Sequence, residues 1–277
     1  MRPYPPTPDI DAADGLLTGG HLWIREWIDG APLRFQLQQS GVLRFGDADR
    51  IFGDGDVPGA YRHAVRHVRE RLDRGALTAA VDDVERVVLF GVATQRLTIG
   101  YDFDRLPSVL GVEVWSADDG FLPPDADERV FDRLGLEPVN AFRKEVSPRD
   151  FDPSPDEIPD SNWYDGHAAG IEIRNTRGPR GKLLHPNLDS KSESPPEPVT
   201  ESATTFARGF ATDARLDSIA GRLDARGTPV TVESLYERLL EDALRRHHRR
   251  LNHPESTVDR RALRSELAAI AGEYLGE

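Results

Sequence analysis

The stretch that most constrains the fold is residues 21–30, which read HLWIREWIDG. In an extended chain its even-numbered side chains point one way and its odd-numbered side chains point the other. Asp29-Gly30 then indicates a tight turn, because glycine tolerates the positive φ that such turns often need. The run Leu33–Leu37 alternates again, so we expect two strands that are joined as a β-hairpin.

The composition excludes several classes of protein. The chain has 277 residues, which is enough for one large or two modest domains with a sizeable core. It has no cysteine, and this excludes disulfides and thiolate metal sites. No apolar run of about 18 residues occurs, so we expect no membrane span. Residues 1–15 are rich in proline and lack the apolar core of a signal peptide, so we expect an extended arm and a cytoplasmic protein.

The charge balance is strongly acidic. Asp and Glu number 48 against 35 Lys and Arg, for a net charge of −13, and the only lysines are Lys144, Lys182 and Lys191. An acidic, lysine-poor surface is typical of a halophile, because salt screens the self-repulsion of dense charge. A GC-rich genome that favours arginine codons is the alternative. The acidity argues against broad capture of nucleic acid in low salt, but that attraction is weak in high salt, so an RNA substrate stays open.

Hydrophobic periodicity predicts the elements that precede residue 189. Residues 59–75 have apolar side chains at helical spacing, and Gly75 is the expected stop. Residues 139–146 are ambiguous. The other expected elements are a strand at the end of 81–91, strands at 97–101 and 109–115, a helix at 127–134 and a loop over 149–161.

The C-terminal part has a different character. Ser, Pro and Glu dominate residues 189–203, so we place a linker at 191–204. Beyond it, helices are expected at 213–226, after the N-cap Thr231, and at 258–275. The strongest basic cluster of the chain, RRHHRR, contains Arg245, Arg246, Arg249 and Arg250. It predicts either contact with an RNA backbone or a solvated face with charges suited to a helix C-terminus.

A family resemblance follows from residues 26–30. The sequence Glu26-Trp27-Ile28-Asp29-Gly30 resembles motif I of the covalent nucleotidyltransferases, the ATP-dependent ligases and RNA ligases, which reads Glu-Lys-x-Asp-Gly. Trp27 stands where the family has the lysine that accepts AMP. An indole offers an N–H donor and no basic lone pair, so it cannot form a phosphoramide.

Two further segments resemble motifs that surround the nucleotide. Residues 88–91 are similar to motif III of the RNA ligases, with Val92 at the position of its glutamate. Residues 111–115 resemble the strand that passes beneath the adenine, and Glu113 would fill the acidic role there or lie at the rim of an ordinary core strand.

The last two motifs would supply the phosphate and metal ligands. Residues 169–174 resemble motif IV, with Ala169 at the position of the metal-binding glutamate and Arg174 at the matching cation. Residues 180–186 resemble motif V, which makes Lys182 the candidate ligand of the α-phosphate. The turn that ends at Arg50 is similar to a substrate-contacting segment of ligases or is a surface turn. Glu26 and Arg34 complete the candidate contacts to nucleotide or phosphate.

The resemblance implies an α+β fold: an antiparallel-sheet nucleotidyltransferase core, the ligase adenylylation fold that is ATP-grasp-like, followed by a small all-helical C-terminal domain. The expected domains are 1–190, ligase-like, and 205–277, helical. ATP and Mg²⁺ or Mn²⁺ would be the cofactors. Because the nucleophile and two acidic positions are replaced, we predict a pseudoenzyme that binds a nucleotide or RNA end in RNA processing or repair. The alternatives are an active RNA ligase that uses Lys182, and a scaffold that binds a protein partner through its C-terminal helices.

Overall fold

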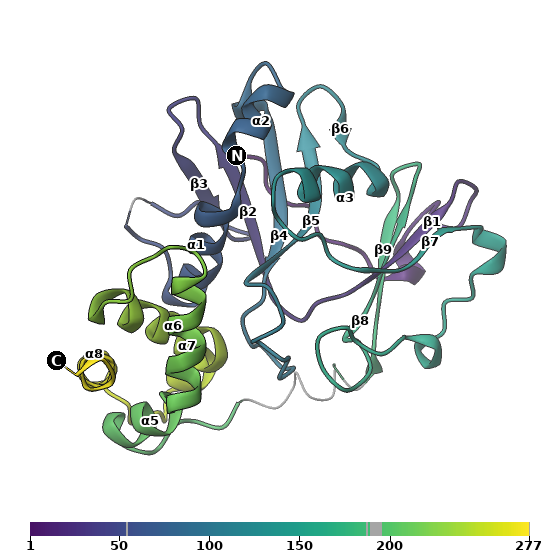
Figure 1. Ribbon diagram of the computed structural model, residues 1–277. Helices are drawn as coiled ribbons and strands as arrows, with labels where there is room; N and C mark the ends of the chain where they lie inside the picture. The colour runs from purple at the N-terminus through teal and green to yellow at the C-terminus, as the bar shows by residue number, and fades with distance from the viewer. Residues whose placement is uncertain (54, 187, 189–195, 277) are drawn as a thin grey trace. The chain divides into compact units, whose positions relative to one another are not determined.

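The computed structural model describes residues 1–53, 55–186, 188 and 196–276 (Figure 1). The chain divides into two compact units. The first comprises Met1–Pro58 and Ala64–Ser194, and the second comprises Gly59–His63 and Pro195–Glu277. Lys191 and the first part of the expected linker lie outside the described residues. Among the described residues, no helix is both long and apolar enough to cross a membrane.

The first unit contains two antiparallel sheets (Figure 1). The four strands of one sheet are, in spatial order, β7 (Ala141–Val146), β1 (Leu22–Glu26), β8 (Gly170–Asn175) and β9 (Arg180–Leu184). The five strands of the other are β3 (Leu43–Gly46), β2 (Ala31–Leu37), β4 (Val87–Ala93), β5 (Val109–Ser116) and β6 (Gly120–Phe121). We call them the four-stranded and the five-stranded sheet. Together with the helices they confirm the expected α+β class.

The hairpin expected over residues 22–37 is wrong. β1 pairs with β7 and β8, whereas β2 pairs with β3 and β4, so residues 27–30 carry the chain from one sheet to the other. Asp29 is not part of a two-residue turn: its carboxylate accepts hydrogen bonds from the backbone N–H groups of Thr98 and Ile99, at 2.7 and 2.8 Å. Gly30 lacks a positive φ and serves close approach instead, since a Cβ there would lie 2.7 Å from the carbonyl oxygen of Ala93.

Strand register places charged side chains between the two sheets. Residues directly opposite each other in an antiparallel pair point to the same face. In the five-stranded sheet Arg34 lies opposite Phe90, and Phe90 lies opposite Glu113. In the four-stranded sheet Glu172 lies opposite both Arg25 and Lys182. Ion pairs join these two faces, as described below, so both face one common cleft.

The helices of the first unit depart from the expected pattern at two points. The helix expected over 59–75 ends early: α1 spans Arg62–Arg71, and Asp73 then caps α2 (Arg74–Ala80), so Gly75 lies inside a helix. Residues 97–101, expected as a strand, form none, because their backbone is tied to Asp29. The helix expected at 127–134 is confirmed as α3 (Pro124–Arg133).

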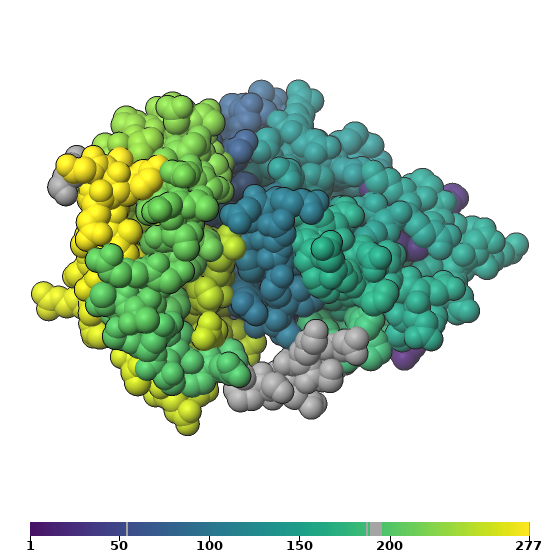
Figure 2. All heavy atoms as spheres, turned by 60° about the horizontal axis from the view of Figure 1, so that its bottom comes forward, coloured from purple at the N-terminus to yellow at the C-terminus, as the bar shows by residue number. Residues whose placement is uncertain are grey.

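The second unit is helical. Its helices are α5 (Ala203–Phe210), α6 (Asp213–Asp224), α7 (Val232–Leu251) and α8 (Arg260–Leu275), which Figure 2 shows in green to yellow. Thr231 caps α7 as expected, in a capping box with Ser234. The sequence pattern missed α5, whose first residues fall inside the range expected as linker. One apolar cluster with contributions from all four helices forms the core of this unit.

Candidate functional site

A pocket of about 100 Å³ lies in the first unit at the crossing between the two sheets. Its lining combines residues from the segment 27–30, which connects the two sheets, with the inner face of the five-stranded sheet and two residues near the N-terminus. The residues used below are Tyr4, Thr7, Glu26, Trp27, Arg34, Asp47, Phe90, Val92 and Glu172. Ligand pockets for drug-sized molecules usually enclose about 300–1,000 Å³, so this one is narrow.

Trp27, at the nucleophile position of motif I, lines the pocket. The ammonium of Lys182 lies 5.4 Å from the centre of the Trp27 ring, within the range of a cation–π contact. It also lies 3.6 Å from a carboxylate oxygen of Asp9. The structure therefore brings together two of the residues that the motifs singled out. Among the described residues, Lys182 is the lysine beside Trp27, whereas Lys144 packs on Trp23.

The positions of the family's acidic metal ligands carry no oxygen here. Val92 lies on the wall of the pocket, and Ala169 is buried at the start of β8. Among the described residues, no group of three or more His, Cys, Asp or Glu side chains has the arrangement needed to hold a metal ion. Mg²⁺ and Mn²⁺ favour carboxylate ligands, so the residues present do not fit the divalent cation of the family.

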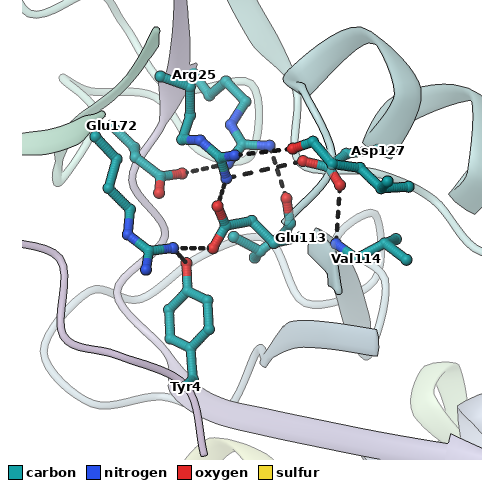
Figure 3. A network of polar contacts seen from close by, with 10 residues as sticks. Tyr4, Arg25, Glu113, Val114, Asp127 and Glu172 are labelled. Atoms are coloured by element: carbon teal, nitrogen blue, oxygen red, sulfur yellow. Dashed lines mark hydrogen bonds and ion pairs between the residues drawn. The ribbon is translucent and has the colours of Figure 1, made fainter. Parts of the chain in front are cut away.

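Next to the pocket, buried arginines and carboxylates fill the cleft (Figure 3). We call them the arginine network, whose members are Arg25, Glu113, Asp127, Glu172, Arg174 and Arg180. A guanidinium nitrogen of Arg25 lies 2.6 Å from Glu172, and both side chains are only 4% exposed. A second nitrogen of Arg25 donates to the carbonyl of Val112 at 2.7 Å.

Glu113 joins the two sheets within this network. It lies on the five-stranded sheet and forms ion pairs with Arg174 and Arg180 of the four-stranded sheet. Arg174 is fully buried and also lies 3.8 Å from Asp127. Glu113 and Arg174 thus use their charges on protein partners, and their predicted roles toward a nucleotide stay predictions.

The network perturbs the titration of Asp127. Burial raises the pKa of this carboxyl to about 7, against the opposing effects of Arg25 and of a hydrogen bond from the Val114 N–H at 2.8 Å. A buried carboxyl is penalised in its charged form, because the protein interior solvates charge poorly. Asp127 therefore changes charge near neutral pH.

Residues 2–9, which we call the N-terminal arm, lie along the cleft. The ring of Tyr4 packs on Phe90 at a centroid distance of 4.8 Å and beneath the guanidinium of Arg180 at 4.9 Å. Burial raises the pKa of Tyr4 to about 12. Further along the arm, Thr7 lines the pocket and the carbonyl of Pro8 accepts a hydrogen bond from the backbone of Lys182 at 2.9 Å. The arm narrows the pocket, and the sequence offered no signal for this contact beyond the single aromatic among the prolines.

Arg34 is the cation that lines the pocket itself. Its side chain is 5% exposed, and its Nε atom has no hydrogen-bond partner. Glu172 contributes an acceptor, since its Oε1 atom is buried and also lacks a hydrogen-bond partner. Two residues of the pocket lining, Arg34 and Glu172, thus each have one buried polar atom that the described residues do not satisfy.

Three other predicted residues lie around this site. Glu26 lines the pocket and accepts hydrogen bonds from the Ser161 hydroxyl at 2.5 Å and the Asn162 N–H at 3.3 Å, and burial raises its pKa. Asp29 holds the loop of residues 98–99 and does not line the pocket. The side chain of Arg50 is 59% exposed and lies 3.7 Å from Asp47, a residue of the pocket wall.

The basic cluster of α7 is engaged within the chain. Arg246 pairs with Asp242 at 2.8 Å, and Arg250 donates to the backbone carbonyl of Glu197 at 3.0 Å. Arg245 is buried. Both Arg245 and Arg249 also make polar or electrostatic contacts within the chain. The predicted RNA contact of these four arginines stays a prediction.

Sequence reasoning singled out Arg34, Glu113, Arg174 and Lys182 but not Arg25 or Arg180. A signal was present for Arg25, which follows three apolar residues in a strand whose residues are all buried, whereas Arg180 begins a strand that also contains Lys182 and is mostly half-buried. A charged residue in such a strand needs a partner when the strand is buried on both faces. The partner cannot be read from the sequence, because it lies on another strand.

Comparison with known proteins identifies the fold. No family model matches the sequence, and no curated protein matches it either. A solved structure of an archaeal ATP-dependent RNA ligase superimposes with a TM-score of 0.50 at 12% identity, covering 90% of this chain and 64% of that chain. RNA ligase from Naegleria gruberi, solved with PPi, gives 0.49 at 10% identity over 70% of this chain and 59% of that chain. This chain thus has the fold of this ATP-dependent RNA ligase and spans about 64% of its length.

Proposed function

We propose that this protein is a ligase-fold pseudoenzyme that binds a phosphorylated nucleotide or RNA end without forming a covalent adenylate. The observation that carries the proposal is Trp27 on the wall of the pocket, at the position where motif I has its nucleophile. An indole nitrogen has no basic lone pair with which to attack a phosphate. Without a nucleophile, a two-step reaction through a protein-bound intermediate is not available.

The loss of acidic residues supports the same conclusion. Transfer of an adenylyl group requires the charge that develops on the phosphates to be neutralised, which divalent metals do in this kind of chemistry. The side chains of Val92 and Ala169 cannot bind a metal, and Glu172 and Glu113 are paired with arginines. Binding needs less than catalysis does: an aromatic surface, a cation and an acceptor suffice, and Trp27, Arg34 and Glu172 supply them.

ATP itself would occupy this pocket only if the N-terminal arm moved. The aromatic side chains of Trp27 and Phe90 would contact the base, and Arg34 would hold a phosphate oxygen. The chemistry that bound ATP supplies in ligases is an activated α-phosphate. In this chain the residues would bind and orient the nucleotide, and we propose no transfer step.

One observation favours a second candidate function, that of an active RNA ligase. Lys182 lies 5.4 Å from the ring centre of Trp27, so a lysine ammonium is held beside the position of the missing nucleophile. A lysine ammonium has three donors and no lone pair, so it is not nucleophilic, and Lys182 also lies 3.6 Å from Asp9. Ligation would require Lys182 to leave both contacts and lose its proton.

Two assays on the full chain separate these functions. Equilibrium binding should show that a 5′-phosphorylated RNA oligonucleotide binds more tightly than its 5′-hydroxyl counterpart, and equal affinity for the two would contradict the proposal. A nick-joining assay with 5′-phosphate and 3′-hydroxyl RNA ends, ATP and Mg²⁺ or Mn²⁺ should give no product at either low or high salt. Product that is lost in Lys182→Ala and kept in the control Lys144→Ala would establish the active ligase instead.

A further inference from the structure

We infer that the pocket is a phosphate-binding site whose anchor is the guanidinium of Arg34, on β2 of the five-stranded sheet. The inference deepens the proposed function and rests on the pocket assigned there. It places the phosphate on the opposite side of the cleft from Lys182 and Arg174, the cations at the matching positions of motifs V and IV.

The position of Arg34 directs it into the cleft. It shares a face of the five-stranded sheet with its register partners Phe90 and Gly46. Phe90 lines the pocket and contacts Tyr4, so this face is the inner one. Gly46 leaves space for the guanidinium, because a Cβ there would lie 3.1 Å from the Nε atom of Arg34.

Arg34 has no counter-charge in the part of the chain that the structure describes. Its Nε lacks a hydrogen-bond partner, and no described carboxylate lies within 4.0 Å of its guanidinium. Asp47, the aspartate on the pocket wall, accepts hydrogen bonds from the backbones of Asp49 and Arg50 at 3.0 and 2.8 Å and lies 3.7 Å from the Arg50 side chain. By contrast, the buried Arg25 and Arg174 both form ion pairs with carboxylates.

The residue Arg34 is 95% buried, and an unpaired guanidinium in such a place is unfavourable, because burial removes water that solvates its charge. An anion from a ligand would supply the missing partner. Arginine suits phosphate in particular, since its planar fork donates two parallel hydrogen bonds to two oxygens. A pocket of about 100 Å³ is suited to such a small group, whereas a whole nucleotide needs the arm displaced.

The other cations of the cleft are less available. Lys182 is held by Asp9 and by the ring of Trp27, and Arg180 by Glu113 and Tyr4. A phosphate that bound to either would have to displace a contact that already exists. Arg34 gains an ion pair without losing one, and this is the physical reason for preferring it.

The test is a thermal-unfolding titration of the full chain with inorganic phosphate, with sodium chloride at matched ionic strength as the reference. At ten times the dissociation constant, phosphate should raise the Tm of the wild type by about 3–6 °C. Arg34→Met should abolish this rise and should have a higher Tm than the wild type without phosphate, because it removes a buried unpaired charge. Arg34→Lys, which keeps a cation, should retain part of the rise, and the exposed control Arg44→Met should retain all of it.

Pairs of ligands then identify the source of the phosphate. AMP against adenosine tests a nucleotide, and 5′-phosphate against 5′-hydroxyl RNA tests an RNA end; in each pair the difference should vanish in Arg34→Met. A wild-type response in Arg34→Met would overturn the inference and leave non-covalent binding, the proposed function, intact. A covalent adenylate on Lys182 would overturn the proposed function while the phosphate response of Arg34 persisted. If Arg34→Met does not fold, the Tm rise of Arg34→Lys is compared with that of Arg44→Met. A rise in Arg34→Lys as large as in Arg44→Met and in the wild type would count against the inference.

Discussion

The buried pair of Arg25 and Glu172 predicts a large coupling in a double-mutant cycle. Arg25→Met leaves the carboxylate of Glu172 buried and unpaired, and Glu172→Leu leaves the guanidinium of Arg25 in the same state. Breaking a buried pair from one side costs about 3–5 kcal/mol, because the remaining charge has lost both water and partner. Each single variant should therefore unfold about 6–20 °C below the wild type, at about 2–4 °C per kcal/mol for a domain of this size.

The double variant Arg25→Met/Glu172→Leu should be more stable than either single variant. Apolar side chains often replace a buried ion pair without loss. The remaining cost is the loss of the hydrogen bond from Arg25 to the Val112 carbonyl, which is about 1–3 kcal/mol when the carbonyl stays buried. The double variant should thus lose about 1–3 kcal/mol in total.

Urea unfolding followed by tryptophan fluorescence is the appropriate assay, because every tryptophan of the chain reports on the first unit. The tryptophans are Trp23, Trp27, Trp115 and Trp163. The exposed pair of Lys144 and Glu128 is a matched control, with the same 2.6 Å separation but side chains that are 44% and 29% exposed. Lys144→Met should cost less than about 1 kcal/mol. If the double variant lost the sum of the two single losses, or if the single variants matched the control, the account of the network would be refuted.

Three further changes have defined outcomes. The pKa of Asp127 is raised from an ordinary 3.8 to about 7 in the folded protein, so the folded protein binds this proton more tightly. The free energy of unfolding should therefore fall as pH rises from about 4 to 7, by at most roughly 4 kcal/mol. Asp127→Asn should flatten this fall in a series of Tm measurements, and an unchanged slope would contradict the prediction. Tyr4→Ala should lower the free energy of unfolding in urea by about 2–4 kcal/mol and should strengthen AMP binding, because it widens the pocket. Tyr4→Phe should lower the free energy of unfolding by about 1 kcal/mol and leave AMP binding unchanged. Thr231→Ala removes the cap of α7 and should cost about 1 kcal/mol by far-UV circular dichroism, while no loss would show that the capping box is dispensable.

Local sequence signals predicted the elements better than their partners. The strand ending near Gly91, the strand from Val109 and the N-cap Thr231 were all predicted, because each depends on residues adjacent in the chain. The placement of β1 and β2 in different sheets was not predicted, because alternating polarity indicates a strand but not the strand with which it pairs.

The candidate site was predictable in part for the same reason. Motif order brought attention to Trp27 and Lys182, and Arg34 was a further candidate contact; the structure places all three at or beside the pocket. The intrusion of Tyr4 depends on contacts with residues about 90 or more positions away, such as Phe90 and Arg180, for which the sequence carries no local signal. Pairing within the arginine network is likewise a property of the assembled sheets.

We propose that Trp27 leaves the pocket of this ligase fold without a nucleophile. The most direct measurement is the intact mass of the full chain after incubation with ATP and Mg²⁺ or Mn²⁺, at low and at high salt, followed by denaturation. We expect the mass of the unmodified polypeptide under every condition. A mass increase of one adenylate, mapped by peptide analysis to Lys182, would contradict it.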